Sequence, residues 1–115
     1  LVLPELAGRI HGYAMRVPTI TGSATDVTVE LSQEASAEAI NAAMKTAAEG
    51  PLKGILQFST EPLVSSDIIG NSHGCIFDSQ LTSSQGNLVK IMGWYDNEAG
   101  YAARLAGVAN TLLNL

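Results

Sequence analysis

His73 and Cys75 are the first candidates for covalent chemistry in this sequence. They lie two positions apart, so on a strand both side chains would point to the same face of a sheet. A thiol beside an imidazole can lose its proton and become a nucleophile. A structural interpretation is favoured, because a lone cysteine is usually a small buried hydrophobe and no third group that would orient the histidine is evident.

Other residues have side chains suited to hold a ligand. Arg16 directly precedes Val17-Pro18, and a guanidinium at the end of an extended segment can grip a phosphate through its planar fork of donors. The alternative for Arg16 is a salt-bridged surface residue. Asp96-Asn97-Glu98 precedes a helical pattern, where acidic and amide side chains most often act as helix caps. His11 is expected to be a partly exposed structural residue.

Composition and charge narrow the range of partners. The 115 residues carry six Lys and Arg against eleven Asp and Glu, a formal net charge of −5, so the long-range field repels nucleic acid. No apolar stretch reaches the roughly 20 residues of a membrane span, and the first residues lack the layout of a signal peptide. One cysteine excludes an intramolecular disulfide and suits a reducing compartment. We expect a soluble, cytoplasmic protein that binds neither nucleic acid nor a membrane.

Periodicity predicts two strands and a helix in the first half of the chain. Bulky residues alternate with small ones from Arg9 to Arg16, which indicates a strand that ends at Val17-Pro18. A second strand is expected from Asp26 to Leu31, with one face buried. Ser36 is predicted to be the N-cap of a helix. Gly50-Pro51 should end that helix, because glycine can adopt the left-handed conformation and proline cannot continue a helix.

The second half is predicted to be mostly sheet, followed by a helix. Strands are expected at Ile55 to Phe58, Cys75 to Phe77, Leu81 to Ser84 and Leu88 to Tyr95, the last two joined as a hairpin. From Asn97 to Leu115 the spacing predicts a terminal helix that covers the sheet with the apolar stripe Tyr101, Leu105, Val108 and Leu112. This order of elements predicts an α+β fold with a largely antiparallel or mixed sheet covered by helices.

A series of motifs in a fixed order extends along the whole chain. They are Leu3-Pro4-Glu5-Leu6, Arg16-Val17-Pro18, Glu49 to Leu56, Val64 to Asp67, His73 with Ile76-Phe77-Asp78, and Trp94 to Glu98 with Gly100-Tyr101. The last motif is by itself highly specific. Together they resemble the phosphorylating glyceraldehyde-3-phosphate dehydrogenase family. The residues from Thr21 to Asp26 look more like those of its bacterial members.

The resemblance implies a glycolytic oxidoreductase that forms a cytoplasmic homotetramer. It would oxidise glyceraldehyde 3-phosphate with NAD and inorganic phosphate to 1,3-bisphosphoglycerate. In that mechanism a cysteine thiolate adds to the aldehyde, hydride passes to the nicotinamide, and phosphate cleaves the resulting thioester. NADP in place of NAD stays open, because the family selects between them with residues upstream of this sequence.

By the same resemblance, three residues of this chain receive roles in binding. Arg16 matches the family arginine that helps to bind phosphate groups at the active site. Asn97 matches the asparagine that holds the nicotinamide carboxamide, and Tyr101 matches a tyrosine packed close to that ring. Groups that only orient two reactants still lower a reaction barrier by several kcal/mol.

The resemblance also implies that the catalytic groups come from elsewhere. The dinucleotide-binding domain, the nucleophile segment and the catalytic histidine have no counterpart here, so residues 1–115 are expected to be a C-terminal catalytic-domain fragment that is inactive alone. Neither Cys75 nor His73 matches a catalytic residue, and no metal site is expected. Ala99 stands where the family usually has an aromatic residue, so looser packing beneath Asn97 is expected.

Two alternatives stay open on the sequence. Erythrose-4-phosphate dehydrogenase shares the fold and most of the motifs, although Leu52 to Leu56 and Val64 to Asp67 favour the glycolytic enzyme. A noncatalytic α+β module, used for association or ligand sensing, could have the same order of strands and helices.

Overall fold

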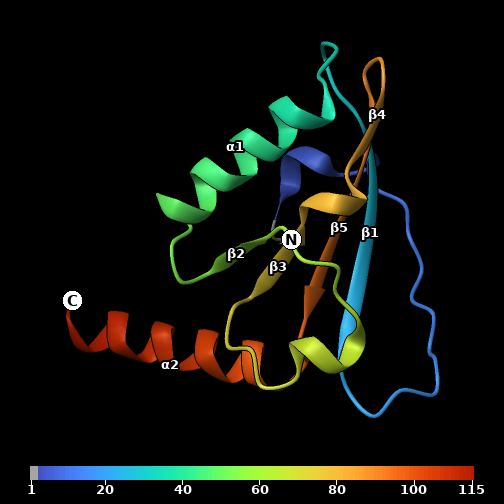
Figure 1. Ribbon diagram of the computed structural model, residues 1–115. Helices are drawn as coiled ribbons and strands as arrows, with labels where there is room; N and C mark the ends of the chain where they lie inside the picture. The colour runs from blue at the N-terminus through green and yellow to red at the C-terminus, as the bar shows by residue number, and fades with distance from the viewer. Residues whose placement is uncertain (1–2) are drawn as a thin grey trace.

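The strands of this chain form one mixed sheet in the computed structural model, which describes residues 3–115 (Figure 1). They are β1 (Ser23–Glu30), β2 (Leu56–Ser59), β3 (Cys75–Asp78), β4 (Ser83–Gln85) and β5 (Leu88–Tyr95). The order is β1-β5-β3-β2, and β4 also pairs with β5. Strand β5 is antiparallel to its three partners, whereas β2 and β3 are parallel. The predicted α+β class is confirmed.

Strand β5 organises the sheet. Its pairing with β1 runs from Leu88 opposite Glu30 to Tyr95 opposite Ser23, so β1 begins earlier than the predicted Asp26. The predicted hairpin is present, with Gly86 at a φ of +63° in the turn between β4 and β5, a conformation that favours glycine. Strand β4 starts later than predicted, because residues 79–81 form the short 3-10 helix η3 (Ser79–Leu81).

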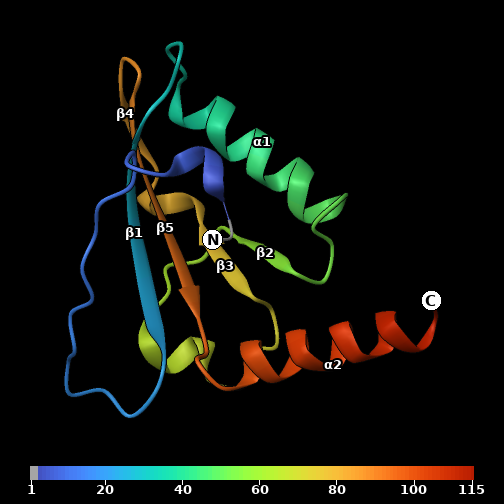
Figure 2. The same ribbon diagram turned by 180° about the vertical axis from the view of Figure 1, so that it is seen from behind.

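Helix α1 (Ala37–Glu49) lies beside β2, as both ribbon views show (Figures 1 and 2). The predicted N-cap is confirmed, because the Ser36 hydroxyl accepts a hydrogen bond from the Ala39 amide at 3.2 Å. Asn41 ties the helix to the chain after β3. Its amide nitrogen donates to the Ser79 carbonyl at 3.0 Å, and its oxygen accepts from the Thr82 hydroxyl at 2.7 Å.

Gly50 ends α1 for a different reason from the one predicted. Its φ is −114°, so the expected left-handed conformation is wrong. A Cβ atom at this position would lie 3.0 Å from the Thr46 carbonyl oxygen. Close approach to the last turn of the helix, and not handedness, therefore favours glycine here.

A small apolar core is built around strands β2, β3 and β5, with side chains on both faces of the sheet. Its buried side chains in the described part of the chain are Leu56, Ile68, Ile76, Phe77 and Val89. The Phe58 ring stacks on Phe77 with 5.7 Å between centroids, which adds to the area contribution of a buried aromatic side chain. The short 3-10 helix η2 (Ser65–Ile68) supplies Ile68, which is completely buried.

The strand predicted from Arg9 to Arg16 is wrong. After the short 3-10 helix η1 (Pro4–Leu6), residues 7–20 run outside β1 as an irregular segment in which every side chain is exposed (Figure 1). Tyr13 is 85% exposed and Ile20 fully so. An extended segment becomes a strand only when another strand pairs with it, and no strand in residues 3–115 does so.

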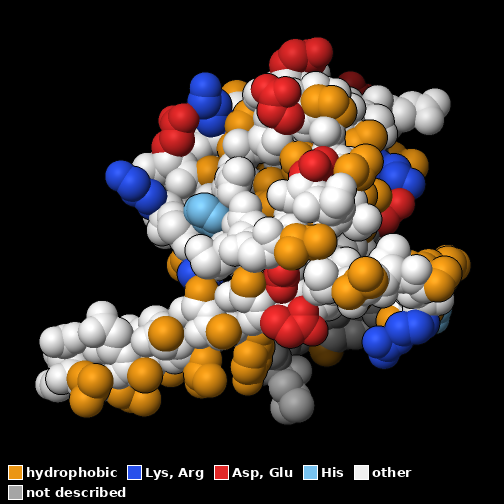
Figure 3. All heavy atoms as spheres, turned by 60° about the horizontal axis from the view of Figure 1, so that its bottom comes forward, with side chains coloured by type: hydrophobic (Ala, Val, Ile, Leu, Met, Phe, Trp, Pro, Cys, Tyr) orange, Lys and Arg blue, Asp and Glu red, His pale blue; other side chains and the backbone are white. Residues whose placement is uncertain are grey.

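Helix α2 (Ala99–Leu113) is present as predicted, but its expected packing is wrong. The helix projects away from the sheet (Figures 1 and 2), and Figure 3 shows hydrophobic side chains along its exposed surface. The predicted stripe is between 57% and 69% exposed; its members are Tyr101, Leu105, Val108 and Leu112. Helical spacing identifies the apolar face of a helix, but it does not identify the surface that covers this face.

We predict that Gly93→Ala destabilises the protein by about 1 to 3 kcal/mol. Gly93 is buried in β5, and a Cβ atom there would lie only 2.5 Å from the Cys75 sulfur. Adding Cys75→Ala should recover most of the loss, as measured by urea unfolding. Gly107→Ala is the control, because no atom lies within 4 Å of its added Cβ. Equal losses in the single and double variants would contradict the close contact as the cause.

Candidate functional site

The carboxylate of Asp96 joins three segments at the end of β5. It is 5% exposed. One oxygen accepts a hydrogen bond from the Gly70 amide at 2.9 Å, and the other accepts from the amides of Glu98 and Ala99 at 2.9 and 2.8 Å. Asp96 thus caps the turn that leads into α2, as the sequence predicted for this group of residues. These hydrogen bonds, led by the one from Gly70, lower the pKa of the Asp96 carboxyl below its ordinary value.

The side chain of Asn97 bridges to the start of β1. Its oxygen accepts from the Gly22 amide at 3.1 Å, and its nitrogen donates to the Ser23 hydroxyl at 2.7 Å. Beside it, the Thr21 hydroxyl donates to the Glu98 carboxylate at 2.9 Å. Two adjacent side-chain bridges therefore connect residues 21–23 with residues 97–98.

Gly22 makes this approach possible. Its φ is +94°, and a Cβ atom there would lie 3.1 Å from the Cδ1 of the buried Ile68. Both the backbone conformation and the space favour glycine. Sequence reasoning did not identify Gly22 or Ser23 as site residues, because the contacts with Asn97 join positions more than 70 residues apart.

Asn97 and Tyr101 lie at the same end of α2. Tyr101 is in the first turn of the helix and follows Asn97, which precedes the helix, by four positions. Its ring is 69% exposed. Arg16 lies in the exposed irregular segment, six positions before Gly22, so its backbone is at most about 22 Å from that glycine. The ion pairs of residues 3–115 do not include Arg16.

The first turns of α2 are anchored on the two loops that flank β2, one before it and one between β2 and β3. A Cβ atom on the buried Gly100 would lie 3.0 Å from the His73 carbonyl oxygen. One turn later, the Arg104 guanidinium donates to the Gly54 carbonyl at 3.1 Å. The start of the helix is therefore fixed, although the rest of it projects.

His73 and Cys75 do not form a catalytic pair in this structure. The His73 Nδ1 atom is 2.9 Å from the Asn71 side-chain oxygen, and Asn71 in turn donates to Gln57 at 2.8 Å. Burial raises the pKa of the Cys75 thiol, which disfavours the thiolate that a nucleophile needs. These observations support the structural interpretation of both residues.

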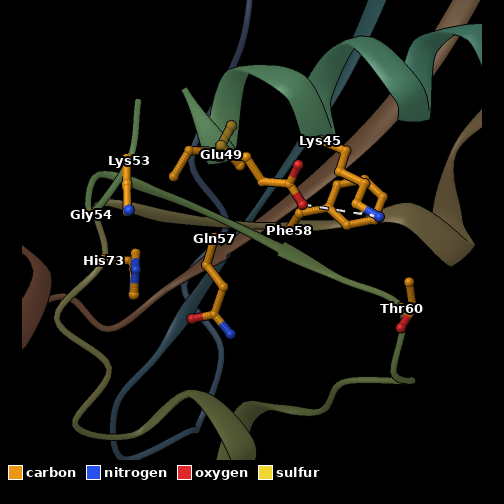
Figure 4. Close-up of a pocket in the computed structure, with 10 residues that line it drawn as sticks. Lys45, Glu49, Lys53, Gly54, Gln57, Phe58, Thr60 and His73 are labelled. Atoms are coloured by element: carbon orange, nitrogen blue, oxygen red, sulfur yellow. Dashed lines mark ion pairs between the residues drawn. The ribbon is translucent and has the colours of Figure 1, made fainter. Parts of the chain in front are cut away.

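A surface hollow lies between the end of α1 and β2. Figure 4 shows it, with Lys45, Glu49, Lys53 and His73 on its sides. Lys45 and Glu49 form an ion pair across 4.0 Å on the solvent side. None of Arg16, Asn97 and Tyr101 lines this hollow, so it does not unite the residues predicted from the sequence.

Residues 3–115 lack both a metal-binding cluster and a membrane-spanning helix. They contain no group of three or more His, Cys, Asp and Glu side chains that could hold a metal ion. In the same part of the chain, no helix has the length and apolar character needed to cross a membrane.

Comparison with known proteins gives the family. A family model described as "Glyceraldehyde 3-phosphate dehydrogenase, C-terminal domain" matches residues 1–97. The chain belongs to the glyceraldehyde-3-phosphate dehydrogenase family. The family match includes Arg16 and Asn97, whereas Tyr101 lies beyond its last matched residue.

Two similar members of this family are bacterial, as the motifs predicted. A glyceraldehyde-3-phosphate dehydrogenase of Mycolicibacterium smegmatis is 58% identical over 106 residues, which cover 92% of this chain and 31% of the relative. Glyceraldehyde-3-phosphate dehydrogenase 2 of Streptomyces avermitilis is 55% identical over 106 residues, 91% of this chain and 32% of the relative. The chain thus spans about a third of the length of these curated relatives.

We predict that Asp96→Asn lowers the free energy of unfolding at pH 5 to 7 and that this loss shrinks below about pH 4. A carboxyl group whose pKa is lowered in the folded state stabilises the fold at pH values above its ordinary pKa, which is 3.8 for this group. That stabilisation disappears as the pH falls through the lower value of the folded state. Urea unfolding across this pH range tests the prediction.

The control for Asp96→Asn is Glu61→Gln, which changes an exposed carboxylate. Its difference from the unmodified protein should stay small throughout the range. A loss for Asp96→Asn that persists undiminished to pH 2 would contradict the role of its charged form.

Proposed function

We propose that this chain is the C-terminal part of the catalytic domain of a phosphorylating glyceraldehyde-3-phosphate dehydrogenase. The complete enzyme would oxidise glyceraldehyde 3-phosphate with NAD and inorganic phosphate to 1,3-bisphosphoglycerate. The observation that carries the proposal is the family match over residues 1–97, which includes Arg16 and Asn97. In this chain the Asn97 amide is held by two hydrogen bonds at the anchored end of α2.

The geometry of Asn97 fits a nicotinamide carboxamide. An asparagine side chain has two N–H donors and two acceptor lone pairs, and the hydrogen bonds to Gly22 and Ser23 use one of each. Asn97 is exposed, so the remaining donor and acceptor can face a ligand. A carboxamide has the complementary acceptor and donor. NAD, when bound, supplies the acceptor for the hydride, and Asn97 would fix the face of the ring.

Tyr101 and Arg16 would complete this chain's contribution. The exposed Tyr101 ring, in the first turn of the helix that follows Asn97, can pack beside a planar ring. Arg16 would bind a phosphate group of the substrate or inorganic phosphate through its fork of donors. Its exposure leaves the guanidinium accessible to such a ligand.

The remaining parts of the active site would come from outside this chain. We propose that they include the dinucleotide-binding domain, the nucleophilic cysteine and the catalytic histidine, so that the chain is inactive alone. We also propose that the complete enzyme is a cytoplasmic homotetramer. The exposed apolar side chains of residues 10–20 and of α2 support association with other surfaces that cover them, because a large exposed apolar patch usually marks an association site.

Asn97→Ala in the full-length protein tests the orienting role. We predict that hydride transfer slows by about ten- to a hundredfold, because the ring loses its fixed orientation. The dissociation constant for NAD should rise by less than about tenfold, as expected for lost hydrogen bonds. Single-turnover kinetics and calorimetry measure the two quantities, and Asn110→Ala, at the far end of α2, is the control. Equal losses in rate and affinity would contradict an orienting role.

Arg16→Ala tests the proposed phosphate contact. We predict that KM for glyceraldehyde 3-phosphate or for inorganic phosphate rises by about tenfold or more, since a charge-assisted hydrogen bond is lost. The affinity for NAD should not change. Arg9→Ala is the matched control, because Arg9 is an exposed arginine of the same segment. Unchanged KM values for both substrates would exclude this role for Arg16.

A further inference from the structure

We propose that Ser23 is a positioning residue, which fixes the plane of the Asn97 amide toward the nicotinamide carboxamide. The inference rests on the proposed function and adds a residue to it. The Ser23 hydroxyl is 2.7 Å from the Asn97 amide nitrogen, the shorter of the two hydrogen bonds that hold this side chain.

The Gly22 amide determines which end of the Asn97 side chain carries the oxygen. A backbone N–H can only donate, so the atom that faces it at 3.1 Å must be the acceptor. The other end, which faces Ser23, is therefore the NH2 group, and the Ser23 hydroxyl accepts from it. A flipped amide would place two donors against each other at Gly22.

Both hydrogen bonds are needed to hold the plane of the amide. The terminal torsion of an asparagine side chain is broad and roughly two-fold, so a single hydrogen bond to its oxygen leaves the plane free to swing. With Ser23 in place, the remaining N–H and the remaining lone pair of Asn97 have fixed directions. A carboxamide ligand would then meet one donor and one acceptor in a set order.

Other contacts would still join the start of β1 to the turn before α2 without the hydrogen bond between Ser23 and Asn97. The hydrogen bond from Thr21 to Glu98, at 2.9 Å, connects the same stretches of chain beside it. Strand pairing of Ser23 with Tyr95 continues the connection through the backbone. Removal of the Ser23 hydroxyl is therefore expected to change the orientation of Asn97 and to leave the fold in place.

The test compares two dinucleotides by calorimetric binding to the full-length protein. The 3-acetylpyridine analogue of NAD keeps the carbonyl group of the carboxamide but lacks its NH2 donor. We predict that the unmodified protein binds NAD about five- to tenfold more tightly than this analogue, the size expected for one hydrogen bond. In Ser23→Ala the ratio should fall below about twofold, and in Ser23→Thr, which keeps the hydroxyl, it should be retained.

Thr21→Val is the matched control, because it removes the adjacent bridge to Glu98 and leaves Asn97 untouched; its ratio should equal that of the unmodified protein. Thermal unfolding checks each variant. If Ser23→Ala unfolds early, Ser23→Cys takes its place, since a thiol is a weak acceptor of similar size.

The outcomes separate this inference from the function on which it rests. A reduced ratio in Asn97→Ala together with an unchanged ratio in Ser23→Ala would overturn the positioning role and leave the proposed function intact. An unchanged ratio in Asn97→Ala would overturn the role of Asn97 itself, and the inference with it. An equal fall in Thr21→Val and Ser23→Ala would also overturn the inference, because loss of either bridge would then act in the same way.

Discussion

The buried carboxylate of Asp96 is the interaction on which the candidate site depends. It accepts hydrogen bonds from the backbone amides of Gly70, Glu98 and Ala99. One side chain therefore holds together the end of β5, the loop after η2 and the start of α2. A buried amide or carboxylate without a hydrogen-bond partner destabilises the folded state. The hydrogen bonds between these groups avoid that loss of stability. Asn97 is the next residue in the chain, and its position follows from this arrangement.

Strand register supplies the other half of the site. The antiparallel pairing of β1 and β5 continues until Ser23 lies opposite Tyr95, which brings the residues before β1 beside those after β5. The donor of Gly22 and the acceptor of Ser23 thereby reach the Asn97 side chain. A shift of one residue would turn the Ser23 side chain to the opposite face, so the site depends on the register as well as on residue type.

Local signals in the sequence were sufficient for α1 and β5, because a capping serine, a hairpin turn and a run of apolar residues determine these elements within a few positions. They were not sufficient where an element needs a distant partner. The alternation from Arg9 to Arg16 and the stripe on α2 are both apolar patterns, yet their side chains are exposed in the described structure. The contacts of Asn97 could not be predicted from the sequence either. They depend on the register of the sheet, which no local sequence pattern encodes.

The exposed apolar side chains of α2 and the polar site around Asn97 need different kinds of contact. The tyrosine and leucine side chains of α2 contribute hydrophobic stabilisation only when another surface removes them from water. The amide of Asn97, in contrast, already has hydrogen-bond partners within this chain. Orientation of a ligand needs little buried area, but it does need donors and acceptors with fixed directions. The described residues can therefore preorganise a carboxamide contact even though apolar surfaces of the same chain are left exposed.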